Sequence, residues 1–250
     1  MTDRFNLYRF ASPATFYPLA GKMIPWFVAA GILFGLAGLY IGMLVAPTDF
    51  QQGEGYRIIF IHVPTSWMSM FIYLVMAFWA AIGLAFNTRL SGMMANALAP
   101  TGALMAFLSL WTGALWGKPM WGTWWVWDAR LTSVLVLFFL WLGHAALVRA
   151  FDDPERGARV GAILALVGFV NVPIVKFSVD WWNTLHQPAS VARLAAPGMH
   201  VDMLYPLLIC TTGFSLLFAA VVLARTRGAV MERRVRALQL ARARREDAPA

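Results

Sequence analysis

The sequence predicts an all-α integral membrane protein with six transmembrane helices, and three observations support this fold class. Hydrophobic residues make up 60% of the 250 residues and charged residues only 13%, which is about half the charged share of a soluble domain. The apolar residues fall into runs of about 20, the length that a helix needs to cross the hydrocarbon core. The runs are apolar on all sides, whereas the strands of a membrane barrel alternate, so a barrel is excluded.

Six apolar runs are candidate spans, taken in chain order. They cover residues 24–46, 63–86, 97–116, 131–149, 160–179 and 203–224. The first run is longer than the apolar region of a cleavable signal peptide, so we expect it to be retained as a span. Pro173 interrupts the fifth run, and we expect it to kink that helix. We find no internal repeat and expect residues 1–250 to form a single membrane domain.

Lysine and arginine are distributed unequally between the two sides of the predicted bundle. With the N-terminus inside, fifteen of them fall in inner segments and four in outer ones, while Lys176 lies within the fifth span. This asymmetry predicts that both termini are cytoplasmic. The net charge of +8 is then explained by orientation and contact with anionic lipid, not by nucleic acid. The basic tail, residues 225–250, could be a surface helix or a disordered segment.

The second outer connection, residues 117–130, is rich in tryptophan. It reads G-K-P-M-W-G-T-W-W-V-W-D-A-R. Trp121, Trp124, Trp125 and Asp128 have the spacing of one helical face, so we expect a short helix lying flat at the interface with its indoles on one side. Such a shelf suits a flat aromatic ligand such as a porphyrin. The alternative is an interfacial aromatic belt, which explains scattered tryptophans but not four, with Trp127, in one short loop.

Three of the four histidines lie on the same outer side as this loop. His62 is at the mouth of the second span, His186 is in the third outer connection, and His200 begins the sixth span, whereas His144 is on the inner side. Any one of them alone is most simply an interfacial polar residue. Two neutral imidazoles from separate connections can, however, fill both axial positions of a heme iron, and His62 and His186 are the candidates. The outer segments also hold four cations for the heme propionates, among which the sequence does not choose: Arg57, Lys118, Arg130 and Arg193.

Several motifs resemble those of the tryptophan-rich heme-handling proteins of cytochrome c maturation. They are W-G-T-W-W-V-W-D from Trp121 to Asp128 with its extension to Ser133, H-V-P at His62–Pro64, and L-H-Q-P at Leu185–Pro188. In length, number of spans and order of loops, the whole chain is similar to the heme exporter protein C family of that system.

The resemblance implies a site, a cargo and partners. The family holds heme b non-covalently at the periplasmic face of the bacterial inner membrane and presents it to a membrane-anchored heme chaperone. An ABC-type ATPase subunit, its membrane subunit and a small one-span subunit complete the complex. The matching positions are two axial iron ligands, His62 and His186, and the heme-binding residues Trp121, Gly122, Trp124, Trp125, Trp127 and Asp128.

The residues themselves agree with a binding protein that is not an enzyme. The chain has no C-x-x-C-H motif for covalent heme attachment and no Gly-Lys phosphate-binding loop. Two alternatives remain open. A membrane b-type cytochrome would usually place its axial histidines inside the spans, and a heme permease would line a path through the midplane with polar residues, of which the spans have few.

Overall fold

The fold is an α-helical bundle in which six helices are long and apolar enough to cross a membrane. The computed structural model describes residues 12–187, 190–191 and 195–246, and this part of the chain contains no strand. The six membrane-crossing helices cover Pro13–Val45, Glu54–Phe86, Arg89–Trp121, Ala129–Arg149, Pro154–Trp181 and Val201–Arg245. The predicted fold class and number of spans are therefore confirmed, whereas the orientation of the termini in the membrane stays a prediction.

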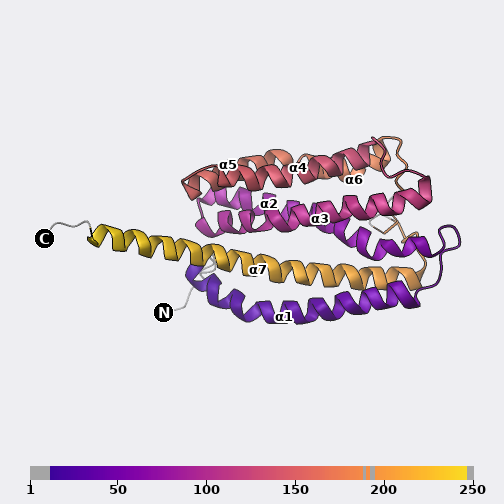
Figure 1. Cartoon of the computed structure of the whole chain (residues 1–250), viewed down its shortest axis with the longest axis horizontal. Helices are drawn as coiled ribbons and strands as arrows, with labels where there is room; N and C mark the ends of the chain where they lie inside the picture. The colour runs from indigo at the N-terminus through magenta and orange to yellow at the C-terminus, as the bar shows by residue number, and fades with distance from the viewer. Residues whose placement is uncertain (1–11, 188–189, 192–194, 247–250) are drawn as a thin grey trace.

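Figure 1 labels the α-helices that build these spans. They are α1 (Pro13–Tyr40), α2 (Ile59–Phe86), α3 (Arg89–Trp121), α4 (Ala129–Arg149), α5 (Pro154–Gly168), α6 (Asn171–Trp181) and α7 (Val201–Glu246). A π-helical turn, Ile41–Val45, continues α1, and a 3-10 helix, Glu54–Ile58, leads into α2. Each membrane-crossing helix begins before the predicted apolar run, and three of them also extend beyond its end.

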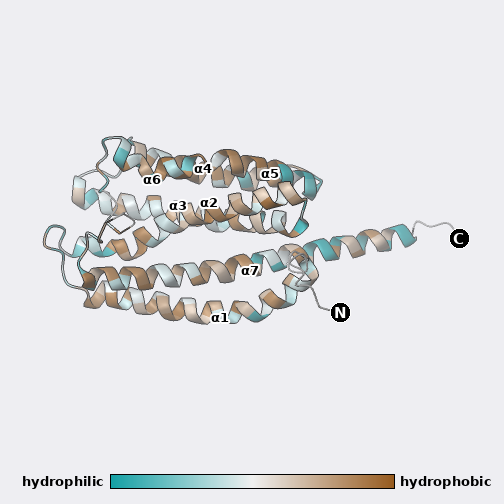
Figure 2. Ribbon diagram, turned by 180° about the vertical axis from the view of Figure 1, so that it is seen from behind, coloured by the Kyte–Doolittle hydropathy of each residue, from teal (hydrophilic) through white to brown (hydrophobic). Residues whose placement is uncertain are grey.

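The helices lie in two groups, seen from opposite sides in Figures 1 and 2, with α1 packed along α7 and the other five forming the rest of the bundle. The α1–α7 contact depends on small residues. A Cβ atom on Gly38 would lie 2.6 Å from the backbone nitrogen of Cys210, and one on Gly213 would lie 2.4 Å from that of Gly35. Close backbone approach of this kind is how small residues join helices in a membrane, where no hydrophobic effect drives them together.

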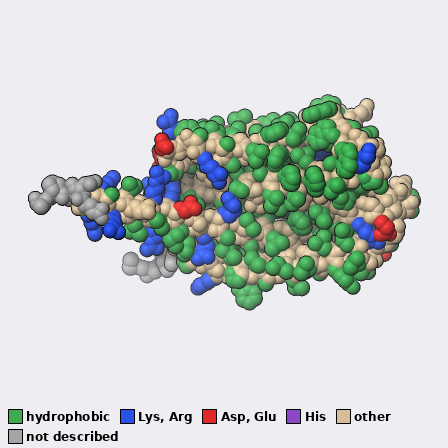
Figure 3. All heavy atoms as spheres, viewed as in Figure 1, with side chains coloured by type: hydrophobic (Ala, Val, Ile, Leu, Met, Phe, Trp, Pro, Cys, Tyr) green, Lys and Arg blue, Asp and Glu red, His purple; other side chains and the backbone are tan. Residues whose placement is uncertain are grey.

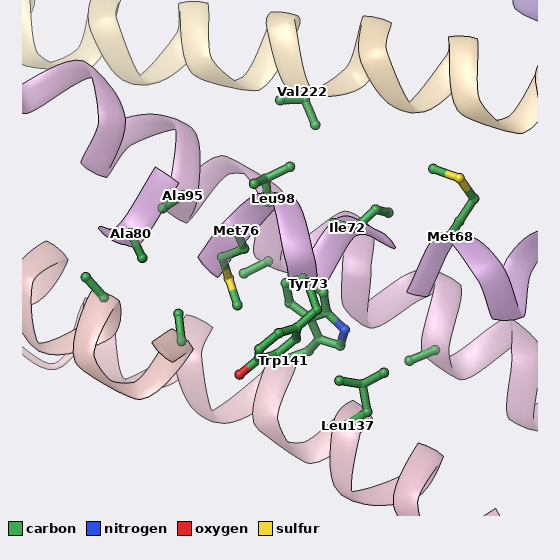
Figure 4. Packing of buried hydrophobic residues seen from close by; sticks show 14 residues of the cluster. Met68, Ile72, Tyr73, Met76, Ala80, Ala95, Leu98, Leu137, Trp141 and Val222 are labelled. Carbon is green, nitrogen blue, oxygen red and sulfur yellow. The ribbon is translucent and has the colours of Figure 1, made fainter. Parts of the chain in front are cut away.

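The centre of the larger group is a tightly packed apolar core, shown in Figure 4. The rings of Tyr73 and Trp141 meet edge to face with centroids 4.8 Å apart, and both side chains are fully buried. Gly102 leaves room for the Trp141 ring, since a Cβ there would lie 2.2 Å from it. This core fixes α2, α3 and α4 relative to one another and so positions what they carry at their ends.

Two sequence expectations are refined by the helix boundaries. The fifth span is interrupted between α5 and α6, at Phe169 and Val170. Pro173 accounts for this break, because it has no N–H to donate to the carbonyl of Phe169 one turn earlier. The basic tail is helical as far as Glu246, since α7 continues out of the bundle without interruption.

The connections and charges sort to the two ends of the bundle. The tryptophan-rich connection and the connections before α2 and after α6 share one end, whereas the short α2–α3 and α4–α5 turns share the other. Figure 3 shows Lys and Arg side chains gathered at the end from which α7 emerges. We refer to the tryptophan end as the outer end and to the opposite one as the inner end, following the predicted orientation.

Candidate functional site

A pocket opens at the outer end between α2, α3, α4 and α6, and we call it the tryptophan pocket. It contains about 1450 Å³ of empty space, its open mouth included. The connection after α6 closes one side of it. Its lining includes His62, His186, Arg130 and five tryptophans: Trp67, Trp116, Trp121, Trp124 and Trp125. The structure thus brings together residues that the sequence places in three separate segments.

His62 lies in the first turn of α2 and not in the preceding connection, which corrects the expected position. Its side chain is buried, and its Nδ1 atom lies 3.0 Å from the Thr112 hydroxyl oxygen. The Thr112 hydroxyl donates its own hydrogen to the carbonyl of Leu108, 2.6 Å away. Thr112 therefore accepts from Nδ1–H of His62. This tautomer leaves Nε2 of His62 as the nitrogen that can bind a metal.

His186 has the same tautomer for a different reason. It lies in the connection after α6, half-buried, and its Nδ1 donates to the carbonyl of Gln187 at 2.9 Å. A backbone carbonyl can only accept, so the proton is on Nδ1 and the lone pair is on Nε2. A hydrogen bond from the second ring nitrogen is the usual way in which proteins orient a metal-binding histidine.

The two imidazoles face the same pocket at a distance that fits one metal ion between them. Their ring centroids are 6.3 Å apart and their planes differ by 38°. Metal–imidazole bonds are about 2 Å long, so two of them on opposite sides of one ion put the ring centres about 6 Å apart. Among the described residues no cluster of three or more His, Cys, Asp or Glu side chains suits a metal held by protein ligands alone. This pair instead matches the two axial positions of a macrocyclic metal complex.

The tryptophan-rich connection is not a helix, so the expected flat helix is wrong. Gly122 ends α3 in the left-handed region at φ 77°, a conformation that glycine adopts readily. Asp128 then begins α4 as its N-cap, with its side chain accepting from the Leu131 N–H at 2.7 Å. The helical spacing of the tryptophans is therefore coincidental, and residues 122–128 form an irregular loop across the mouth of the pocket.

The four predicted tryptophans have different places, Trp121 as the last residue of α3 and the other three in the loop. Trp121, Trp124 and Trp125 line the tryptophan pocket. Trp127 is outside the lining and 77% exposed, with its ring edge to face with that of Trp125 at 5.4 Å. Sequence reasoning missed Trp116, in the last turns of α3, whose ring contacts that of His62 with centroids 5.6 Å apart. Trp116 lies five residues before Trp121, just ahead of the tryptophan-rich connection, and this proximity in sequence was the only signal for it.

Neither Asp128 nor Gly122 lines the pocket. Gly122 contributes by ending α3, and Asp128 contributes through hydrogen bonds. The second carboxylate oxygen of Asp128 accepts the hydroxyl of Thr184, and the Thr184 oxygen in turn accepts from the backbone N–H of His186 at 3.1 Å. This chain of hydrogen bonds ties the tryptophan loop to the histidine connection. Thr184 was not predicted, because nothing in a lone threonine two residues before a histidine indicates such a contact.

The structure selects among the candidate cations. Arg130 lines the pocket and its Nε atom is buried without a partner among the described residues. Arg57 instead pairs with Glu54 and donates to the carbonyl of Gly42, and Lys118 donates to the carbonyl of Gly122. Lys176 also lines the pocket, from α6. Arg193 and Pro188 lie outside the described residues.

Burial and the nearby Arg130 guanidinium lower the pKa of His186, and metal binding requires a neutral imidazole. Because the pKa lies below the ordinary value of about 6.5, His186 keeps its neutral form to a lower pH than a free histidine does. We expect the affinity for an iron porphyrin to stay constant down to about pH 6.5 and to fall only below it. Absorbance titrations at stepped pH values measure this midpoint. Arg130→Gln should move it upwards, and a midpoint above about 6.5 in the unaltered protein would contradict the expectation.

A family model and several known proteins that match this chain all have the same name. The family model described as "Heme exporter protein C" matches residues 6–241. Heme exporter protein C of Bradyrhizobium diazoefficiens is 50% identical over 240 residues, which cover 96% of this chain and 91% of that protein. The proteins of the same name from Haemophilus influenzae and Escherichia coli K12 are 47% and 44% identical, over 88% and 90% of this chain and 90% and 91% of their own lengths.

Proposed function

This chain belongs to the heme exporter protein C family, and from that membership and the geometry of the tryptophan pocket we propose that it binds heme b non-covalently at the periplasmic surface and presents it to a membrane-anchored heme chaperone. The family places the chain in heme handling for cytochrome c maturation, as a multi-pass inner-membrane protein. The proposal adds the residues that hold the heme and the direction of its delivery.

The histidine pair is the observation that carries the proposal. His62 and His186 offer Nε2 lone pairs from two different elements, at a ring separation that fits one iron. Each is oriented through its Nδ1–H, so neither needs to change tautomer when iron binds. Two axial nitrogens would leave no free coordination position on the iron, so oxygen could not bind there before the heme is transferred.

The tryptophans supply the surface that a porphyrin needs. Trp121, Trp124 and Trp125 present indole rings to the pocket, and aromatic rings recover apolar area and favourable stacking or edge contacts with a flat macrocycle. Arg130 is half-buried and lines the pocket, and its buried Nε atom has no hydrogen-bond partner among the described residues. Its guanidinium therefore suits a heme propionate, which can accept from this N–H. In this arrangement the protein provides binding and orientation, and the cofactor supplies the chemistry.

The outer rim of the pocket is the proposed docking face for the chaperone. Trp124 is 55% exposed and Trp127 is 77% exposed, in a loop outside the membrane-crossing helices. Exposed tryptophans next to a cargo site are typical of interface hot spots. The ABC-type ATPase subunit, its membrane subunit and the small one-span subunit are part of this proposal, since the family name implies an export system with further components.

An absorption spectrum and a transfer assay together test the proposed function. We expect protein purified from membranes to show a low-spin, six-coordinate heme spectrum, and to pass that heme to an added chaperone domain, measured as heme bound covalently to the chaperone. Trp124→Ala should slow transfer by about tenfold, the loss of one interface hot spot, while the purified variant keeps its fold. Trp26→Ala, which removes a 78% exposed indole from α1, is the matched control and should transfer normally.

Two results would count against the proposal. A five-coordinate spectrum would mean that one histidine does not bind iron. Reduction of the bound heme by added quinol, without transfer to the chaperone, would instead indicate a membrane b-type cytochrome.

A further inference from the structure

A second cavity lies at the inner end of the bundle, and we call it the basic cavity. It contains about 1600 Å³ of empty space, its open mouth included, between α2, α3, α5, α7 and the last residue of α4. It shares no lining residue with the tryptophan pocket. Six arginines from four helices contribute to its lining: Arg89, Arg149, Arg159, Arg225, Arg233 and Arg236.

The positive charge of the basic cavity is only partly neutralised within the described residues. Its lining holds two acidic side chains, Glu155 and Glu232. Glu155 is shared by two arginines, with Arg89 at 3.1 Å and Arg233 at 3.7 Å. Six cations facing two carboxylates leave an excess positive charge, which is unfavourable in a concave site unless an anion is present. The cavity therefore favours an anionic ligand.

The floor of the basic cavity is apolar, which restricts the kind of anion. Its lining contains Ala80, Met93 and Ala162, which are buried, and the half-buried Leu84, whereas five of the six arginines are exposed. These residues come from the helices at the level where the apolar spans end, so the arginines lie at the height of the lipid headgroups. A small soluble anion would gain nothing from this floor, whereas an anionic lipid would place its phosphate among the arginines and its glycerol and first methylenes on the floor. Basic pockets between helices on the cytoplasmic side are typical sites for such headgroups.

The extension of α7 belongs to this site. Arg233 and Arg236 lie beyond the apolar part of α7, and Arg233 reaches Glu155 of α5. An anion held between Arg236 of this extension and Arg149 or Arg159 of the bundle would join the two. We propose that the basic cavity binds the phosphate headgroup of an anionic phospholipid and that this lipid fastens the α7 extension to the bundle. The proposal does not depend on the heme site.

Native mass spectrometry of the full chain tests the lipid assignment. Protein is incubated with mixed micelles that contain equal parts of phosphatidylglycerol and phosphatidylcholine, and the retained lipids are counted. We expect retained phosphatidylglycerol in excess. In the triple variant Arg149→Gln, Arg159→Gln, Arg236→Gln this preference should fall by at least about tenfold. The reason is that each arginine near an anionic headgroup contributes its own attraction, and three of them are removed. No preference in the unaltered protein would overturn the proposal.

A matched variant separates the cavity from general surface charge. Arg234, Arg244 and Arg245 lie on the same α7 extension, are exposed, and do not line the cavity. Changing these three to glutamine removes the same charge and should leave the lipid preference within about twofold of the unaltered protein. An equal loss in both triple variants would reduce the effect to surface attraction and overturn the proposal.

Two further arms distinguish the source of the anion and the state of the protein. Inorganic phosphate at millimolar concentration should not displace the lipid; if it does so completely, the site takes soluble phosphate and the lipid assignment fails.

Heme content, read from the absorption spectrum, should be unchanged in the cavity variant, which shows that the fold is kept. If that variant loses heme while retaining phosphatidylglycerol, the cavity handles heme and not lipid, and the proposal is overturned.

Discussion

Replacing His186 with alanine is expected to lower heme affinity by more than about 100-fold, because loss of an outer partner of a metal ligand already costs 10- to 100-fold and this change removes the proposed ligand itself. His62→Ala should have a similar effect. Heme content per protein and a heme titration of the apoprotein measure both. Excess imidazole should restore part of the six-coordinate spectrum by filling the vacant axial position, a result that an unfolded variant would not give.

Two other histidines provide controls for this result. His200 is exposed at the same end of the bundle, pairs with Asp202 at 3.5 Å, and does not line the tryptophan pocket. His200→Ala should therefore keep its heme. His144 is fully buried, with its Nε2 atom 3.2 Å from Oδ1 of Asn96, a residue of the inner end. Replacing His144 with alanine should leave the heme spectrum of the folded variant unaltered. Loss of heme from the His144 variant alone would contradict the outer location of the site.

The spans could be predicted from sequence because the bilayer requires apolar side chains over about 20 consecutive residues, and this requirement is visible in the local composition. Every run of apolar residues of sufficient length becomes a helix there, whatever it packs against. The exact helix ends were less predictable. His62 belongs to α2 because a 3-10 turn, Glu54–Ile58, starts the helical segment earlier than the apolar run does.

The tryptophan loop shows where a periodic pattern misleads. The spacing of Trp121, Trp124, Trp125 and Asp128 fits a helix, yet Gly122 stops one helix and Asp128 starts the next. Both residues are typical of helix ends, so the signals for a loop were present within the same segment. The two end signals decide the structure, because a left-handed glycine and an N-cap aspartate interrupt the helix that the periodicity indicates.

Contacts between distant segments were beyond the sequence. The Asp128–Thr184–His186 chain of hydrogen bonds joins residues 56 positions apart, and the support of His62 by Thr112 joins residues 50 apart. Neither threonine has a local pattern that indicates its partner. The same holds for the basic cavity, whose arginines were assigned from sequence to membrane orientation alone, because their gathering around one hollow depends on how four helices pack.

Replacing Gly113 with leucine is expected to weaken heme binding strongly without removing any proposed ligand. Gly113 lies on α3 and lines the tryptophan pocket, and a Cβ atom there would be 3.1 Å from Cε1 and 3.6 Å from Nδ1 of His62. The further atoms of leucine must either displace the imidazole from Thr112 or fill the part of the tryptophan pocket next to it, which is the space proposed for the porphyrin. We expect the heme affinity of Gly113→Leu to fall by about 100-fold, close to that of His62→Ala.

Gly143, a glycine without close neighbours, provides the control for this substitution. Gly143 lies on α4, exposed, and a Cβ there would meet nothing within 4 Å. Gly143→Leu introduces the same side chain into a membrane helix and should leave both protein yield and heme content unchanged. Gly113→Ala should fall between the unaltered protein and Gly113→Leu, because its single Cβ contact at 3.1 Å asks the His62 ring to shift by only a few tenths of an ångström. Full heme content and an unaltered spectrum in Gly113→Leu would mean that iron does not bind His62 in this conformation, since the added side chain and a liganded imidazole cannot share that space.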